Sequence, residues 1–236
     1  MFTPNDYLKL WERGVLLHAI DRALLILHRA MPEAKFSDLI CWPLGERDRR
    51  LLQLHRDNFG DRLDAYADCP ACRERLEFSL SCAVLLAQEQ SVTAAVKSVE
   101  VDGAHFELRC PDSADAAAMA AAASVEAGVD VMLTRCVRSA GGFNDLTPAR
   151  RAAVVAELAA LDPVAEILLD LSCVACGHDW TMVFDIGHFL WLEIRARARR
   201  LLQEVDALAR SYRWSEAEIL GLSDARRALY LEMALS

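Results

Sequence analysis

The alternation of hydrophobic and polar positions predicts helices over the first 60 residues. Apolar residues recur at helical spacing at Leu17, Ile20, Leu24 and Leu27. Thr3-Pro4 is a start signal, so a helical segment is expected from there to about Arg29, and Gly14 can interrupt it. A second helix is expected from Leu44 to Asn58, with Gly60 at the position of a glycine stop.

The same pattern predicts helices in the middle and at the end of the chain. The Ala-rich stretch from Asp112 to about Ser139 is expected to be helical, with Asp112 or Ser113 as its cap. Thr147-Pro148 begins another helix that ends near Leu161, before Asp162-Pro163. A long helix is expected from Gly187 to Tyr212. Beyond it, Ser215 to Glu218 form a capping box, and Ser223 can cap the last segment.

Three stretches with a period of two predict β-hairpins instead. In the first, residues 63–67 lead into Cys69-Pro70-Ala71-Cys72, and alternate residues beyond it are apolar. The second surrounds Asp102-Gly103, a pair that tolerates positive φ at both turn positions. In the third, alternating apolar residues lead into Cys173-Val174-Ala175-Cys176 and out of it to Ile186.

These elements predict a mostly helical α+β fold with two cysteine-bearing hairpins and an additional hairpin. No Pro/Gly/Ser-rich linker is visible, so residues 1–236 are expected to form a single domain. Its parts are N-terminal helices (1–60), a split four-cysteine zinc ribbon (61–82 and 164–186), an inserted hairpin with helices (83–163) and C-terminal helices (187–236).

Composition and charge narrow the classes of function. The 236 residues are 54% hydrophobic and 26% charged, which is typical of a globular chain. A net charge of −9 disfavours nucleic acid as a partner, because phosphate binding relies on Lys and Arg. Neither a signal peptide nor a run of about 20 apolar residues is visible, so we expect a cytoplasmic protein without a membrane partner.

The two Cys-x-x-Cys pairs are the strongest chemical signal. Each lies at the tip of a predicted hairpin, where two thiolates can meet a metal ion at tetrahedral spacing. Eight cysteines without an export signal also favour a reducing compartment, where clustered cysteines bind metal more often than they form disulfides. We therefore expect Cys69, Cys72, Cys173 and Cys176 to bind one structural Zn²⁺, although 100 residues separate Cys72 from Cys173.

Other interpretations of the pairs stay open. The two turns could be unligated, or they could form a redox dithiol, although redox pairs usually open a helix and these open strands. His178 could replace one thiolate, but it is also typical of an exposed turn. Gly177 supplies the positive φ that such a turn favours, whereas Arg73 is a weaker match. The other cysteines are interpreted as buried thiols: Cys41, Cys82, Cys110 and Cys136.

The remaining candidates are weaker. The basic run Arg195 to Arg200 is offset by Glu193, Glu204 and Asp206, which favours a solvated helix face over an anion site. A buried stripe is expected on the same helix, at Trp191, Leu192, Leu201, Leu202, Val205 and Leu208. No nucleophile elbow, phosphate-binding loop or metalloprotease helix is visible. We expect neither an enzyme nor a small-molecule substrate.

The order of several short runs resembles a family of proteins encoded with phage-tail-like contractile injection systems. In the N-terminal half these runs are residues 42–48 (WPLGERD), Phe59-Gly60 and Cys69 to Cys72. In the C-terminal half they are residues 171–180 (LSCVACGHDW), 184–186, 214–220 (WSEAEIL) and 227–233 (RALYLEM). The chain is more distantly similar to the baseplate hub assembly chaperones of T-even-like phages.

This resemblance implies a non-enzymatic assembly chaperone or structural component, with baseplate, hub or spike proteins of a contractile tail as partners. The alternative is a zinc-ribbon protein with a nucleic-acid-binding or regulatory function. Salt-dependent retention on heparin would distinguish such a nucleic-acid-binding protein from an assembly factor. Large apolar groups on the C-terminal helices are either a partner surface or part of the core: Trp191, Tyr212, Trp214, Tyr230 and Met233.

Overall fold

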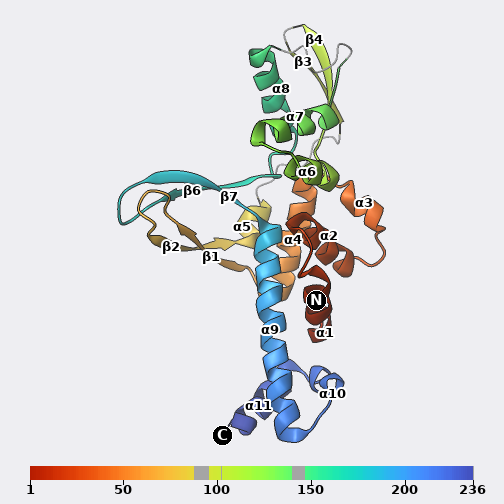
Figure 1. The fold of residues 1–236 in the computed structure, drawn as a ribbon, viewed down its shortest axis with the longest axis vertical. Coiled ribbons are helices and arrows are strands. Elements are labelled where there is room, and N and C mark those ends of the chain that lie inside the picture. The colour runs from red at the N-terminus through yellow and green to blue at the C-terminus, as the bar shows by residue number, and fades with distance from the viewer. Residues whose placement is uncertain (88–95, 102, 140–146, 236) are drawn as a thin grey trace.

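The structure is a computed structural model that describes residues 1–87, 96–101, 103–139 and 147–235. Its long axis follows helix α9 (Ile186–Tyr212), with one lobe above it, a pair of hairpins to the side and two short helices at its lower end (Figure 1). The fold is α+β, as predicted, with short antiparallel strands between helices.

Four N-terminal helices surround the first half of α9. They are α1 (Pro4–Gly14), α2 (Ala19–Ala30), α3 (Phe36–Ile40) and α4 (Leu44–Phe59). Of these, α1, α2 and α4 pack on α9 directly, and α3 packs on α2. Their apolar faces meet α9 in the main hydrophobic cluster, whose fully buried members include Ile26, Leu27, Leu51 and Ile194. The short helix α3 was not predicted, because five residues carry no helical period.

The predicted interruption at Gly14 is confirmed. A side chain at this position would lie 2.5 Å from Cζ3 of Trp191, so only glycine lets α1 approach α9 here. Arg22 donates a hydrogen bond to the Gly14 carbonyl (Nε···O 2.9 Å), which holds the loop into α2. Thr3 and Asp6 form a capping box at the start of α1, and Gly60 ends α4 with φ 98°.

Two separate hairpins project from the side of α9 (Figure 1). The first is β1 (Arg62–Asp68) with β2 (Arg75–Ser81), and the second is β6 (Ile167–Ser172) with β7 (Asp179–Phe184). Each has an alternating pattern of burial, so each places one apolar face toward the protein. Residues at their bases, such as Leu63 and Phe184, belong to the main cluster.

The lobe above α9 contains the inserted segment. Strands β3 (Val96–Val101), β4 (Ala104–Arg109) and β5 (Val137–Ser139) form one antiparallel sheet. Helices α7 (Val125–Cys136) and α8 (Pro148–Leu161) pack on this sheet, and α6 (Ser113–Ala120) packs on α7 at the base of the lobe. A second hydrophobic cluster fills this lobe, with Phe106, Leu108 and Val154 fully or almost fully buried. The predicted hairpin is confirmed, although Asp102 of its turn lies outside the described residues.

The prediction of one helix from Asp112 to about Ser139 was wrong in two respects. The helix divides, because Ser124 caps a new one by accepting a hydrogen bond from the Ala127 N–H. Residues 137–139 are strand β5, in which Val137 pairs with Leu108. An Ala-rich run hides such a break, since alanine suits every face of a helix. Asp112, not Ser113, is the cap of α6.

Backbone and carboxylate contacts attach the upper lobe to α4. Pro43, the residue before α4, gives it no side-chain cap. Instead Asp162, at the end of α8, accepts a hydrogen bond from the Gly45 N–H (2.8 Å), and the Leu44 N–H donates to the Pro111 carbonyl. A carboxylate 117 residues away in sequence therefore caps this helix.

Helices α10 (Glu216–Leu220) and α11 (Asp224–Leu235) return along the second half of α9. The predicted capping box at Ser215 is present, and Ser223 caps α11 through the Arg226 N–H. Arg227 is 1% exposed and bonds Glu204 (Nε···Oε2 2.6 Å), Asp224 (Nη2···Oδ1 2.6 Å) and the Leu222 carbonyl. This guanidinium joins α9, α11 and the loop before α11.

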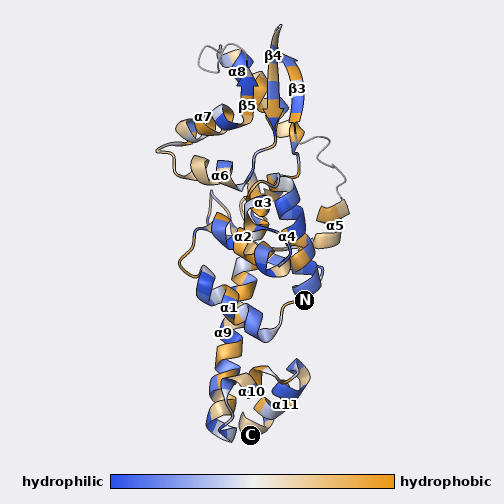
Figure 2. Cartoon of the chain, turned by 90° about the vertical axis from the view of Figure 1, so that its right-hand side faces the viewer, coloured by the Kyte–Doolittle hydropathy of each residue, from blue (hydrophilic) through white to orange (hydrophobic). Residues whose placement is uncertain are grey.

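Two details of α9 differ from prediction. Trp191, Leu201 and Leu208 of the predicted stripe are buried, but Leu192 and Leu202 are exposed and Val205 is half-buried. The buried stripe also includes three residues that were not predicted: Leu190, Ile194 and Ala198. Ile186 does not continue the strand but begins the helix, because Asp185 caps it by accepting from the His188 N–H. Among the described residues, no helix is both long enough and apolar enough to cross a membrane. Figure 2 shows that hydrophobic and hydrophilic residues are interspersed in the upper lobe, in the N-terminal helices and in α10 and α11.

Replacing Arg227 should loosen the C-terminal helices. Arg227→Ala leaves the Glu204 carboxylate without its partner in a largely buried position, and we expect a loss of about 3 kcal/mol in the free energy of unfolding. Arg226→Ala, the neighbouring exposed arginine, should change it by no more than about 0.5 kcal/mol. Urea unfolding measures both, and equal effects would contradict the role of Arg227.

Candidate metal centre

The four predicted cysteines come together where the tips of the two hairpins meet. The Sγ atoms of Cys69, Cys72, Cys173 and Cys176 all lie within 4.8 Å of one another. Across the two hairpins, Cys69 is 3.7 Å from Cys176, and Cys72 is 3.6 Å from Cys173. Among the described residues this is the one group of metal-ligating side chains close enough to share an ion.

The two cysteine turns have the same local geometry. In the first, the Cys69 N–H donates to the Glu74 carbonyl (2.9 Å) and the Arg73 N–H donates to the Cys69 carbonyl (2.9 Å). In the second, Cys173 pairs in the same way with His178 (2.9 Å) and Gly177 (2.8 Å). The residue after each second cysteine has positive φ, 65° at Arg73 and 70° at Gly177. The weaker match at Arg73 thus adopts the required conformation without glycine.

The sulfur spacing fits a tetrahedral metal site. With metal–sulfur bonds of about 2.3 Å, two ligands at the tetrahedral angle lie about 3.8 Å apart. The distances of 3.6 Å and 3.7 Å agree with this value. They are far longer than a disulfide bond of about 2.05 Å. One cysteine of each turn, Cys69 and Cys173, is buried, and the other is exposed.

The environments of Cys69 and Cys72 shift the pKa values of their thiols in opposite directions. Burial opposes ionisation of Cys69, but hydrogen bonds from the backbone N–H groups of Cys72 and Ala71 and from neighbouring thiols lower its pKa to about 6. The Glu74 N–H acts to lower the pKa of Cys72, yet the thiol of Cys176 and lost hydration raise it to about 12. Several thiolates this close repel one another, and a bound cation removes the repulsion.

His178 does not join the sulfur cluster. Its ring stacks on Trp180, with ring centroids 6.1 Å apart and 14° between the planes. The ligand set within the described residues therefore consists of four sulfurs, which leaves no open position for water or substrate. Such a closed arrangement can hold two hairpins together, but it offers no site for metal-centred catalysis.

The other four cysteines differ from the prediction at one position. Cys82, Cys110 and Cys136 are buried, as expected, whereas Cys41 is exposed. It follows the short helix α3, whose residue Leu39 is the one that enters the core. Burial raises the pKa of Cys82 and of Cys110 to about 11, which keeps both as neutral thiols.

Sequence reasoning missed a buried ion cluster in the upper lobe. Asp115 is fully buried and accepts hydrogen bonds from Arg109 (2.6 Å and 2.8 Å) and Arg135 (2.6 Å). After the opposing effect of burial, these guanidinium groups hold the pKa of Asp115 well below its usual range. A single Asp in an Ala-rich run carries no pattern that could have revealed it.

The residues considered for anion or partner binding are divided between surface and core. Arg195, Arg199 and Arg200 are exposed, while Arg197 forms an ion pair with Asp224 (2.7 Å). Trp191 is 3% exposed and belongs to the main cluster. Three aromatic rings pack on one another, with centroids 4.7–5.7 Å apart, and are half-buried: Tyr212, Trp214 and Tyr230. Met233 is exposed.

Comparison of the chain with protein-family models, with curated proteins and with solved structures finds no match.

Removing one sulfur ligand should release the metal and destabilise the protein. Cys173→Ser replaces a buried thiolate with a poor ligand, and we expect metal uptake to be lost and the free energy of unfolding to fall by about 3 kcal/mol or more. Cys41→Ser, at an exposed cysteine outside the cluster, should change neither. Co²⁺ absorbance and thermal unfolding give the two readouts. Retained metal binding in Cys173→Ser would refute the ligand assignment.

Proposed function

We propose that the four cysteines bind one structural Zn²⁺ ion. Zinc favours four thiolates in a closed tetrahedral arrangement, and the sulfur distances of 3.6 Å and 3.7 Å are the observation that supports it. The split zinc ribbon then consists of two hairpins whose strands do not pair with each other and whose tips share the ion. The ion would supply charge neutralisation and a cross-link, and no chemistry.

We further propose that the protein is a non-enzymatic assembly chaperone or structural component for the baseplate or hub of a contractile phage tail or phage-tail-like injection system. The observation that carries this proposal is the resemblance in the order of the short runs described above. The runs fall where the fold is held together: residues 69–72 and 171–180 form the cysteine turns, and 214–220 contains the capping box of α10.

The last run adds to this argument. Residues 227–233 begin with Arg227, the buried guanidinium that fixes α11 to α9. The runs therefore belong to parts of the fold that hold a pair of hairpins and a short helical end at fixed positions along α9. Such a scaffold suits a protein that positions other proteins.

The metal should be zinc, bound more weakly at lower pH. Because the pKa of the Cys72 thiol is raised to about 12, this thiol must lose a proton when it binds an ion, and protons therefore compete with the ion. We expect elemental analysis of untagged protein to find one zinc per chain, and we expect apparent affinity to fall from about pH 8 to about pH 6. Absence of zinc, or an affinity independent of pH over this range, would contradict the proposal.

The protein should form a complex with a tail protein. When it is co-expressed with the baseplate and hub proteins of the same injection system, we expect at least one of them to co-purify. Cys173→Ser should lose this partner because the hairpin arm loses its cross-link, whereas Cys41→Ser should retain it. If the wild-type protein retains no tail protein and instead binds heparin in a salt-dependent manner, the alternative of a nucleic-acid-binding protein is favoured.

A further inference from the structure

The second hairpin leaves one edge of β6 unpaired. Strand β6 pairs with β7 alone among the described residues. The Cys173 N–H bonds the His178 carbonyl, so in an antiparallel ladder the next bonded pairs are Leu171 with Trp180 and Leu169 with Met182. The N–H and C=O groups of Leu168 and Asp170 therefore point away from β7.

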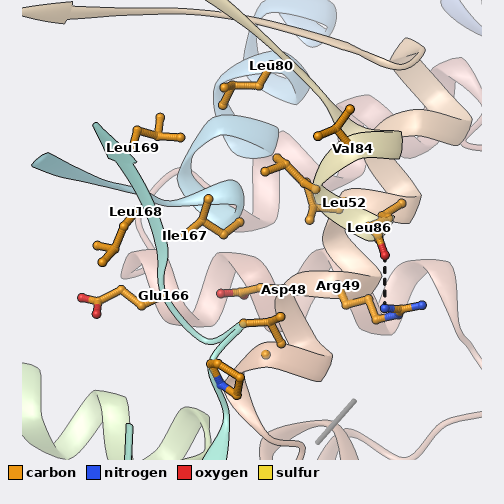
Figure 3. A pocket seen from close by; sticks show the side chains of 14 residues that line it. Asp48, Arg49, Leu52, Leu80, Val84, Leu86, Glu166, Ile167, Leu168 and Leu169 are labelled. Atoms are coloured by element: carbon orange, nitrogen blue, oxygen red, sulfur yellow. Dashed lines mark hydrogen bonds between the residues drawn. The ribbon is translucent and has the colours of Figure 1, made fainter. Parts of the chain in front are cut away.

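An apolar pocket of about 270 Å³ runs along this edge (Figure 3). Three consecutive residues of β6 line it: Ile167, Leu168 and Leu169. Because neighbouring side chains of a strand point to opposite faces, this pattern places the pocket beside the strand edge. Its far wall is formed mainly by Leu52 of α4, Leu80 of β2 and the helix α5 (Cys82–Ala87), which contributes Val84 and Leu86. Two charged residues of α4, Asp48 and Arg49, also line the pocket.

The size and lining of the pocket favour a side chain over a small molecule. Small-molecule sites usually measure about 300–1,000 Å³, so this pocket lies below their range. Its mouth is bordered by exposed apolar groups, with Val84 62% exposed and Leu168 56% exposed. Apolar walls next to unpaired strand hydrogen bonds are the combination that binds an added β-strand.

The two faces of β6 differ in polarity, and this difference determines which side chains an added strand should carry on each face. On the face of Ile167 and Leu169, an added strand would direct its side chains into the apolar pocket. On the opposite face Leu168 lies between two exposed carboxylates, Glu166 and Asp170. Opposite charges at neighbouring positions of paired strands stabilise pairing, so that face suits Lys or Arg.

We infer that β6 accepts an extended segment of a partner protein, in which apolar residues alternate with basic ones, as a third strand. The apolar side chains occupy the pocket against Leu52 and Leu80, and the basic side chains lie beside Glu166 and Asp170. This inference names the contact made with the proposed tail or hub partner and thus rests on the proposed function. It places the contact on the hairpin that carries Cys173 and Cys176.

The hairpin offers a matched pair of variants. Leu168→Pro removes the outward N–H of β6 and blocks strand addition, while proline is tolerated at a strand edge. Val183→Pro makes the same change on β7, at the residue that pairs with Leu168. Val183 is 53% exposed, and its N–H points away from β6, toward the opposite edge of the hairpin. Glu166→Lys changes the charge without altering the backbone and serves if a proline variant fails to fold.

The probe is a fluorescein-labelled peptide of about ten residues in which Val and Lys alternate, compared by anisotropy with a peptide of the same composition in which the valines are grouped. We expect the zinc-loaded wild-type protein and Val183→Pro to bind the alternating peptide within about twofold of each other. Leu168→Pro should bind it at least about tenfold more weakly, and Glu166→Lys should also bind more weakly.

Two results would overturn the inference: equal binding by Leu168→Pro and Val183→Pro, or no preference of the wild type for the alternating peptide. Co-purification of the same variants with tail proteins separates this outcome from failure of the proposed function. A tail protein retained equally by both proline variants would leave the function standing and remove the β6 contact. A tail protein retained by no variant and not by the wild type would remove the function itself.

Discussion

The structure depends on the closure of four sulfur atoms at the tips of two hairpins that are distant in sequence. An isolated two-stranded hairpin is marginally stable in water. Here each hairpin is held at its base by the main hydrophobic cluster, through residues such as Leu63 and Phe184, and the four cysteines lie together at the two tips. The proposed Zn²⁺ would join Cys72 to Cys173 and close a loop of 100 residues, which in the chain-entropy model of cross-links would stabilise the fold by about 4–5 kcal/mol.

Buried charges perform the corresponding task elsewhere. Asp162 attaches the upper lobe to α4, Asp115 joins α6 to the strand before it, and Arg227 attaches α11 to α9. Each group has specific partners, and removal of one partner leaves a charge or a polar group buried and unpaired. The attachment at Asp162 is incompletely hydrogen-bonded, because its buried Oδ1 atom has no hydrogen-bond partner. Burial raises the pKa of this carboxyl. The upper lobe is therefore attached through few, directional contacts.

Much of this arrangement could be predicted from the sequence because its signals are local. The cysteine spacing, the capping box at Ser215 and the alternation into Cys173 each depend on residues that are neighbours in the chain. The meeting of the two cysteine pairs was predictable for a chemical reason, since a closed thiolate site needs four ligands. The function proposed for the chain rests on resemblance and stays a prediction.

What could not be predicted depends on contacts between distant segments. Nothing near Pro43 indicates that its helix is capped from residue 162, and the burial of Arg227 follows from Glu204 on another helix. Exposure of Leu192 and Leu202 was mispredicted because leucine indicates a buried face only on average. The break in the Ala-rich run was missed because alanine occurs on both the buried and the exposed face of a helix, so the sequence carries no periodic signal that would end at the break.

X-ray absorption fine structure at the zinc edge tests the central claim most directly. If the ion joins the two hairpins, the protein as purified should show four sulfur ligands at about 2.3 Å and no nitrogen or oxygen ligand. A shell of mixed ligands, or fewer than four sulfurs, would mean that the two cysteine pairs do not share one ion and that the hairpin arm is held together in another way.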